Sequence, residues 1–275
     1  MPHAKVVVLP RTGSPSTRFD STRGLTLQVD GWQLFAHCPA GPRSLTSPVV
    51  VLVHGLEDSS ESMLGVARAL APDHRVYAID LPGFGRSEGP PEGLDVPVLA
   101  DALAAWLAAM KLTDVTIAGS STGCQVVARM AARYPARVAR IVLESPTLDP
   151  LVRTSVRLLA AWVRNLPHAP LREARRVLRI LWANGPRRVR QSLRRVLADH
   201  IEDSLPRIAM PALVINGARD AIAPGRWAAD VAKRLPAGRL QVVPGVEHGV
   251  SSLAPRAFAA AVYRFVRDVP ERHAA

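Results

Sequence analysis

Short apolar runs alternate along most of the chain with segments in which apolar residues recur every three or four positions. Continuous runs such as Val49–Val53 predict strands buried on both faces, whereas the three-to-four spacing predicts amphipathic helices. The expected strands are 49–53, 75–79, 115–118, 138–143, 212–215 and 240–243, and the expected helices are 60–70, 98–110, 122–134, 225–235 and 255–268. This alternation predicts an α/β fold, in which a mostly parallel central sheet carries helices on both faces.

Two parts of the chain depart from this rhythm. Residues 24–38 read as a hairpin that turns at Asp30-Gly31, a dipeptide that favours tight hairpin turns. Residues 147–205 hold only helical patterns, in three apolar stripes separated by prolines and by Gly185-Pro186. We therefore expect a flexible N-terminal arm (1–16), an α/β core (17–146 and 206–275) and an inserted all-helical lid (147–205) above the sheet.

Composition fits one large domain with an insertion, since the chain has 275 residues and 48% of them are hydrophobic. No apolar run reaches about 18 residues, and Val6–Leu9 is too short for the core of a signal peptide. Cys38 and Cys124 are the two cysteines, too few for a disulfide framework. These features predict a cytoplasmic protein without stable membrane insertion. Because no pair of His or Cys residues has the spacing of metal ligands, we expect no metal and no cofactor.

The chain is strongly basic, with a formal net charge of +12, and much of the excess lies between Arg153 and Arg207. Such a balance raises the possibility of a nucleic-acid partner. This region lacks interleaved aromatic residues, zinc-finger spacing and an RNA-recognition motif. We therefore expect no nucleic-acid partner, and interpret the arginines as a solvated helical face that could attract an anionic small molecule.

The clearest chemical signal is the segment Gly119-Ser120-Ser121-Thr122-Gly123, which lies between an expected strand and an expected helix. A serine at the apex of such a strand–turn–helix has the context of a G-x-S-x-G nucleophile elbow. Two later loops supply the partners that a serine nucleophile requires, because Asp220 follows the strand 212–215 and His248 follows 240–243. All three residues are thus expected at the carboxyl edge of the sheet.

With these segments the chain resembles the α/β-hydrolase superfamily from about Gly24 to Arg267. Val51-Leu52-Val53-His54-Gly55 is similar to the family's third strand and its His-Gly turn, and Asp80–Ser87 is similar to the loop after the fourth strand. The resemblance implies that Ser121 is the nucleophile, His248 the general base and acid, and Asp220 the carboxylate that orients His248. It also implies an oxyanion hole formed by the backbone N–H groups of Thr122 and Leu56.

Several residues have alternative readings. Ser120 is a second hydroxyl beside the apex, while Glu144 and Asp149 follow the strand where some family members place the acid; we favour Ser121 and Asp220. Cys124 is more typical of a packed residue than of a nucleophile. His54, Ser120, Trp162 and Trp182 are candidate substrate-binding residues, although His54 could instead be structural and the tryptophans could be lid core.

A serine nucleophile favours acyl chemistry over epoxide opening or halide displacement. The sequence therefore predicts a serine hydrolase that cleaves a carboxylic ester, lactone or thioester of a small or medium organic molecule through an acyl-enzyme. One alternative is a C–C bond hydrolase or a tailoring enzyme of secondary metabolism with the same triad. Another is a non-hydrolytic, ligand-binding member of the fold.

Overall fold

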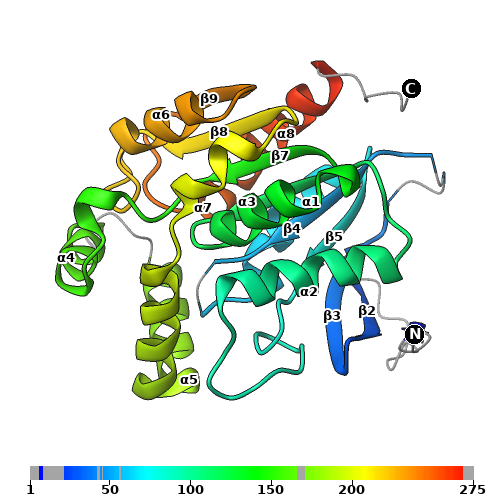
Figure 1. Cartoon of the computed structure of the whole chain (residues 1–275), viewed down its shortest axis with the longest axis horizontal. Coiled ribbons are helices and arrows are strands. Elements are labelled where there is room, and N and C mark those ends of the chain that lie inside the picture. Colours follow the sequence, from blue (N-terminus) through cyan, green and yellow to red (C-terminus); the bar gives the residue numbers. More distant parts are fainter. Residues whose placement is uncertain are drawn as a thin grey trace.

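A nine-stranded sheet runs through the part of the computed structural model that is described here, namely residues 6–8, 22–41, 44, 46–55, 57–165 and 171–268 (Figure 1). The strands are β1 (Val6–Val8), β2 (Thr22–Val29), β3 (Trp32–Pro39), β4 (Val49–Val53), β5 (Arg75–Ile79), β6 (Val115–Ser120), β7 (Val138–Glu144), β8 (Ala212–Gly217) and β9 (Gly238–Val243). They are ordered β1-β2-β3-β5-β4-β6-β7-β8-β9. Strands β4 to β9 pair in parallel, while β1, β2 and β3 pair antiparallel. The expected mostly parallel α/β sheet is confirmed.

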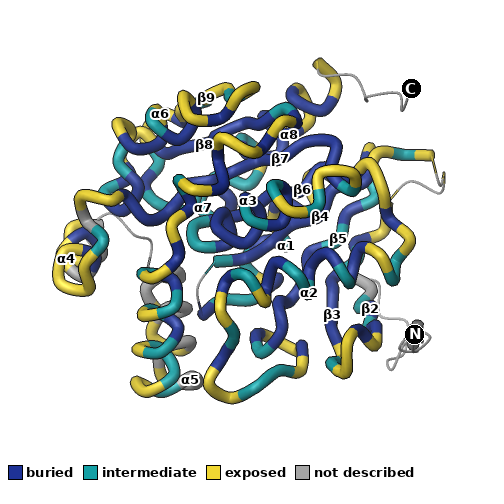
Figure 2. Tube along the Cα trace, viewed as in Figure 1, coloured by how far each residue is buried: buried dark blue, intermediate teal, exposed yellow. Residues whose placement is uncertain are grey.

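Helices cover both faces of this sheet because the side chains of its central strands alternate. Val49, Val51 and Val53 of β4 pack with α2, α3 and α6, whereas Val50 and Leu52 pack with α1 and α8 on the other face. The tube in Figure 2 shows these strands as the buried centre of the molecule. The helices are α1 (Leu64–Leu70), α2 (Val96–Ala109), α3 (Gly123–Arg133), α4 (Ser155–Asn165), α5 (Leu171–Ala198), α6 (Gly225–Arg234), α7 (Val250–Leu253) and α8 (Pro255–Asp268).

The strand order reverses at β4, which lies between β5 and β6. The chain leaves β4 for β5 on one side and then crosses back to β6 on the other. Parallel sheets open a crevice at such a switch point, beyond the carboxyl ends of the strands. The loops that follow β4 and β6, which contain His54 and Ser121, therefore meet at this crevice.

The segment between β7 and β8 is helical, and we call its helices α4 and α5 the helical insertion. They lie at the left edge of the molecule in Figure 1. Helix α5 is interrupted at Gly185, whose φ of 71° and ψ of 157° are not helical. The break expected at Gly185-Pro186 is therefore present, and the second and third apolar stripes lie on the two halves of α5.

The second half of α5 is attached to the core by polar contacts at its C-terminal end. Gln125 of α3 donates hydrogen bonds of 3.0 Å to the main-chain oxygens of Val196 and Asp199. Arg129, one turn later on α3, lies 2.6 Å from the Asp199 carboxylate. Since α3 begins directly after the turn at Ser121, these bonds fix one end of the insertion relative to that turn.

Within residues 1–16, the expected flexible arm, the structure describes Val6–Val8. These residues form β1, which pairs antiparallel with Leu25–Leu27 of β2. They extend the sheet by one strand rather than forming a loose arm, and the rest of this segment lies outside the described residues. The expected hairpin is present, since β2 and β3 pair and are joined at Asp30-Gly31.

Candidate active site

Ser121 lies at the apex of a tight turn between β6 and α3. Its φ of +54° is in the left-handed region, which is uncommon for a residue other than glycine. Its N–H donates a 2.8 Å hydrogen bond to the Glu144 main-chain oxygen, and its own carbonyl accepts a 3.0 Å bond from the Cys124 N–H. Strand β7 and the first turn of α3 thus hold the strained conformation from both sides.

The two glycines of the pentapeptide are required by close approaches of main chain. A Cβ on Gly123 would lie 2.4 Å from the His54 oxygen, and one on Gly119 would lie 2.7 Å from the Gly123 oxygen. Both distances are far inside van der Waals contact, so a side chain on Gly123 would push the turn away from the end of β4, and one on Gly119 would push against the start of α3. The spacing of small residues around Ser121 therefore has a direct steric cause.

The structure brings the three residues of the expected triad together. His248 Nε2 lies 3.0 Å from Ser121 Oγ. On the other side of the ring, His248 Nδ1 lies 2.9 and 3.1 Å from the two carboxylate oxygens of Asp220. A carboxylate, an imidazole and a hydroxyl in this order can remove the hydroxyl proton as its oxygen attacks an electrophile.

Main-chain hydrogen bonds hold the carboxylate of Asp220 independently of its contact with His248. Its Oδ1 accepts hydrogen bonds from the N–H groups of Ile222 (2.9 Å) and Ala223 (2.7 Å). Gly217, at the end of β8, lets the loop that carries His248 approach closely, since a Cβ there would lie 2.3 Å from the Val246 oxygen. The loops after β8 and β9 therefore interlock and place Asp220 against His248.

The pKa shifts of this pair have opposite signs. Burial alone would raise the pKa of Asp220, but the charge and hydrogen bond of His248 outweigh burial and hold it below the ordinary 3.8. Burial alone would lower the pKa of His248, but the charge and hydrogen bond of Asp220, together with the charge of Glu144, outweigh burial and raise it above 6.5. The pair therefore favours a charged carboxylate beside an imidazole that accepts a proton readily.

Of the two expected oxyanion donors, the structure describes Thr122, which follows Ser121 in the turn between β6 and α3. Thr122 is the residue before the first turn of α3, where N–H groups lack partners within the helix. Leu56 lies outside the described residues. Its neighbour Gly55 is close to the apex, because a Cβ on Gly55 would lie 3.3 Å from Ser121 Cβ. A small pocket of about 30 Å³ beside this turn is lined by Gly55, Thr122 and Val196 among others, so α5 contributes to its wall.

His54 is bound to main chain on both sides of its ring. The Leu81 N–H donates a 3.1 Å hydrogen bond to His54 Nε2, so this nitrogen carries no proton. The ring proton must then lie on Nδ1, which is 2.8 Å from the Gly55 oxygen. Both nitrogens are occupied in joining the loops after β4 and β5, which supports the structural reading of His54.

The remaining candidates lie apart from the triad or have other partners. Ser120 is the last residue of β6 and is 9% exposed. Trp182 is 89% exposed on α5, so it is neither a buried pocket wall nor part of a lid core, contrary to both readings of the sequence. Trp162 belongs to α4, but its side chain lies outside the described residues.

Both alternative acids contact groups other than His248. The carboxylate of Glu144 accepts hydrogen bonds from the Val250 N–H (2.7 Å) and the Ser251 hydroxyl (3.0 Å). It thereby fixes α7, a helix absent from the sequence prediction, just after His248. Asp149 is paired with Arg226. Asp220 is the one of the three that lies against the imidazole.

The thiol of Cys124 has a packing role beneath the elbow. It is fully buried and lies 3.1 Å from the Gly119 oxygen and 3.2 Å from the Glu144 oxygen. Burial raises its pKa well above the usual range. A thiol held in this protonated form is a poor nucleophile.

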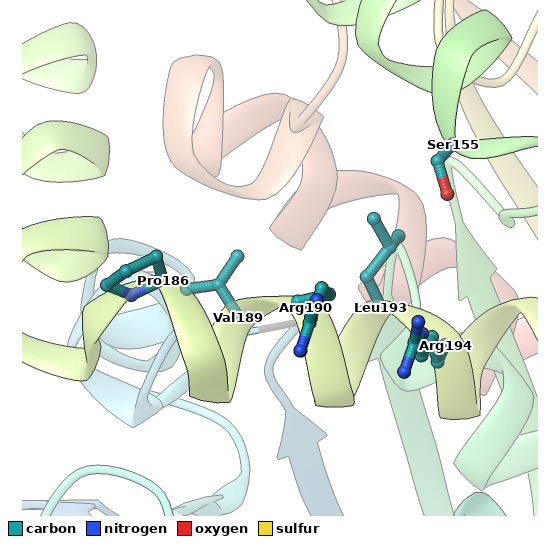
Figure 3. Close-up of a pocket in the computed structure, with 6 residues that line it drawn as sticks. All are labelled: Ser155, Pro186, Val189, Arg190, Leu193 and Arg194. Carbon is teal, nitrogen blue, oxygen red and sulfur yellow. The ribbon is translucent and has the colours of Figure 1, made fainter.

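A cavity of about 560 Å³ lies between α4 and α5 (Figure 3). Its lining comes from one stretch of α5 and from the start of α4, and it consists of Ser155, Pro186, Val189, Arg190, Leu193 and Arg194. The walls are mostly apolar, with two arginines among them. Within the described ranges, no group of three or more His, Cys, Asp or Glu side chains could hold a metal ion.

No helix among the described residues is both long enough and apolar enough to cross a bilayer. A contact that the sequence did not predict joins Arg188 of α5 to Glu57. The only local signal for it was an acidic residue two positions after the His-Gly turn.

Comparison with known proteins agrees with this architecture. The family described as alpha/beta hydrolase fold matches residues 48–199, and a family described as TAP-like protein matches residues 188–272. The first match covers more than half of the chain. The chain therefore belongs to the alpha/beta hydrolase fold family and is a hydrolase.

Two relatives that align along most of the chain share less than 30% of their residues with it over the aligned length. The chain is 28% identical over 249 residues, which are 80% of this chain and 95% of the relative, to a pimeloyl-[acyl-carrier protein] methyl ester esterase of Nitrosospira multiformis. It is 27% identical over 86% of its length to 95% of a putative 2-succinyl-6-hydroxy-2,4-cyclohexadiene-1-carboxylate synthase of Bacillus subtilis. A hydrolase structure from Pseudomonas aeruginosa superposes with a TM-score of 0.74 over 90% of this chain and 99% of that one, at 22% identity. That last likeness concerns the fold.

Proposed function

We propose that the protein hydrolyses a carboxylic ester of a small or medium organic acid through an acyl-enzyme on Ser121. The observation that carries this proposal is the continuous hydrogen-bonded line from Asp220 through His248 to Ser121 Oγ. Relatives that align with 80% and 84% of the chain are named as methyl ester esterases, which supports an ester over other acyl substrates.

In the first half of the reaction, Ser121 Oγ attacks the ester carbonyl carbon while its proton moves to His248 Nε2. The carbonyl oxygen becomes an oxyanion, which the N–H groups of Thr122 and Leu56 stabilise. His248 then gives the proton to the leaving alcohol as the C–O bond breaks, and the acyl group stays on Ser121. Asp220 holds the imidazole in the required tautomer and stabilises its charged form.

In the second half, water replaces the alcohol. His248 takes a proton from the water as its oxygen attacks the acyl carbon, and the second oxyanion uses the same donors. Collapse of this intermediate returns the proton to Ser121 Oγ and releases the carboxylic acid. The enzyme thus returns to its starting protonation state, with no net proton retained.

The helical insertion acts as a lid that selects the substrate. Its cavity of about 560 Å³ is large enough for part of an organic acid, and its mostly apolar walls suit an alkyl or aryl group. No residue of the triad lines this cavity, so Arg190 and Arg194 would meet an anionic group on the part of the substrate that lies away from Ser121. The substrate class that these features support is a medium-length ester that also carries a carboxylate or a similar anion.

The test compares Ser121→Ala with the matched neighbour variant Ser120→Ala on p-nitrophenyl butyrate. We expect Ser121→Ala to lose at least about 10⁴-fold in kcat, because the nucleophile is gone, while its thermal unfolding stays unchanged. Ser120→Ala should retain most of the activity. A fluorophosphonate probe should label the wild-type protein and Ser120→Ala but not Ser121→Ala.

Wild-type turnover by Ser121→Ala would refute the assignment of the nucleophile. Labelling of Ser121 without turnover of any ester would keep the nucleophile but refute ester hydrolysis. Absence of labelling in a folded sample would favour a non-hydrolytic member of the fold.

A further inference from the structure

Glu57 is a buried carboxylate next to the turn that is expected to supply an oxyanion donor. It is 5% exposed, and its φ of +51° lies in the left-handed region. Such a conformation persists where the surroundings hold it. A buried charge likewise needs a partner. Glu57 has no role in the proposed chemistry, so its burial and its backbone conformation both require another explanation.

Arg188 of the helical insertion provides that partner. Its Nε lies 3.4 Å from Glu57 Oε2, an ion-pair contact without the geometry of a hydrogen bond. Its other guanidinium nitrogens donate to main-chain oxygens of the loop after β5, Nη1 to Pro91 at 3.3 Å and Nη2 to Gly83. The side chain is 16% exposed, so screening by solvent is limited. One guanidinium therefore joins α5 to the loops after both β4 and β5.

The same guanidinium also reaches the turn by a second route. It lies over the ring of Phe84, 5.1 Å from the ring centroid. Phe84 in turn packs edge-on against His54, with ring centroids 5.3 Å apart. His54 Nδ1 binds the Gly55 oxygen, and a Cβ on Gly55 would lie 3.3 Å from Ser121 Cβ. The ion pair acts on Glu57, and the edge-on contact between Phe84 and His54 acts on Gly55.

We propose that Arg188 is a positioning residue for the oxyanion hole, which it holds through Glu57 and Phe84 when α5 is seated on the core. This inference rests on the proposed function, because it assumes that an N–H at position 56 stabilises an oxyanion. It makes the helical insertion part of the catalytic geometry as well as a cover for the substrate. The contacts of Arg188 with Glu57 and Phe84 hold the described residues of the turn after β4, Gly55 and Glu57, in their active arrangement.

Arg195 offers a matched control on the same helix. It too fastens α5 to the loop between β5 and α2, through the Asp95 carboxylate at 2.8 Å and the Glu92 main-chain oxygen. No described contact of Arg195 involves Glu57, Phe84 or His54. Its removal should loosen the insertion without acting on the oxyanion turn directly.

The experiment measures kcat and KM of Arg188→Met and Arg195→Met on p-nitrophenyl butyrate. We expect Arg188→Met to lower kcat about 10- to 100-fold, because a displaced donor stabilises the transition state poorly, with little change in KM. Arg195→Met should change kcat by no more than about threefold, as expected for a half-exposed ion pair. Arg188→Lys keeps the positive charge but not the planar guanidinium with its several N–H donors. It should therefore recover part of the lost kcat.

Glu57→Gln completes a double-mutant cycle. If Arg188 acts through Glu57, the double variant Arg188→Met/Glu57→Gln should be no slower than Arg188→Met by more than about twofold. Losses that multiply, an unchanged kcat in Arg188→Met, or an equal loss in Arg195→Met would each overturn the proposal. The last result would show that docking of the insertion alone sets the rate.

Amide hydrogen exchange provides a readout that does not depend on any substrate. Exchange at Gly55, Glu57 and Asp58 should be at least about tenfold faster in Arg188→Met than in the wild type and Arg195→Met, because the turn opens locally. If the wild-type protein cleaves no ester but exchange is faster in Arg188→Met, the proposed function fails and the positioning role of Arg188 at this turn is supported. If exchange at these amides is equal in all three proteins, the positioning role of Arg188 is refuted whatever the activity.

Discussion

At the scale of single residues, the candidate site depends on a charged carboxylate held beside an imidazole in a buried setting. Asp220 has no exposed side-chain surface, and His248 is 8% exposed. Two main-chain N–H groups stabilise the anion of Asp220, so the carboxylate stays ionised and supports positive charge on His248. The pKa of His248 is raised above 6.5 for this reason.

The sign of the pH dependence follows from that shift. His248 can act as a base only when it is neutral, so kcat/KM should rise with pH through a pKa above 6.5. Asp220→Asn removes the charge that raises this pKa, and burial then lowers it. We expect the rising limb of the pH–rate profile to move to lower pH, with kcat reduced by about 10⁴-fold from loss of the orienting carboxylate.

Asp149→Asn is the matched control, since Asp149 is an equally buried acid whose partner is Arg226. This variant should keep the position of the rising limb, whatever it does to stability. The measurement is kcat/KM for a neutral ester across the pH range in which all three proteins remain folded. If the rising limb of the pH–rate profile stayed in place in Asp220→Asn, the claim that the charge of Asp220 raises the pKa of His248 would be refuted.

At the scale of secondary-structure elements, the turn between β6 and α3 works because main chains approach closely around it. The carbonyl of His54, at the end of β4, occupies the space that a side chain on Gly123 would need. The first turn of α3 can therefore pack against β4, with Ser121 raised above the sheet. The geometry of one residue is thus set by the distance between two elements.

Gly123→Ala should destabilise the protein by about 1–3 kcal/mol or more and abolish activity, because its Cβ would meet backbone that cannot yield. Gly225→Ala is the control, since Gly225 also begins a helix but a Cβ there meets nothing within 4 Å. That variant should be neutral or more stable by about 0.4–1 kcal/mol. Thermal unfolding of both variants checks the prediction, and similar stabilities would contradict the steric argument.

At the scale of the whole molecule, positive charge is concentrated on the helical insertion. Residues 155–198 contain eleven arginines and one acidic residue, Glu173. Some of these arginines attach the insertion to the core, as Arg188 and Arg195 do, while Arg190 and Arg194 line its cavity. Because arginines far outnumber acidic residues in the insertion, its electrostatic field should attract anionic molecules to this side of the protein.

An ionic-strength series tests this attraction. From about 0.01 M to about 0.5 M salt, kcat/KM for a p-nitrophenyl monoester of a dicarboxylic acid should fall several-fold, since the Debye length shrinks from about 30 Å to a few ångströms. A neutral ester of equal length should change little. Arg190→Gln/Arg194→Gln should weaken the salt dependence for the anionic ester, and equal salt dependence for both esters would contradict the steering.

Most of the architecture was predictable because the central strands and the long helices have a periodicity that a short stretch of sequence contains, whereas β1 and the short helix α7 were not predicted. Val49–Val53 and Pro255–Asp268 have the bounds that their patterns predicted. The Ser, Asp and His candidates were equally accessible, because each directly follows a strand and parallel strands end at one edge. Glycine spacing and chain order are local facts, so the sequence alone determined the fold class and the candidate triad.

Only the tertiary structure decided which side chains of distant segments touch. Arg188 was one of many arginines on an amphipathic helix, and nothing in its neighbourhood of the chain distinguishes it from Arg190. The exposure of Trp182 and the partner of Glu144 were likewise out of reach of local pattern. Such contacts depend on the packing of α5 and β7 against loops many residues away, where side-chain shape and charge act only after the elements have assembled.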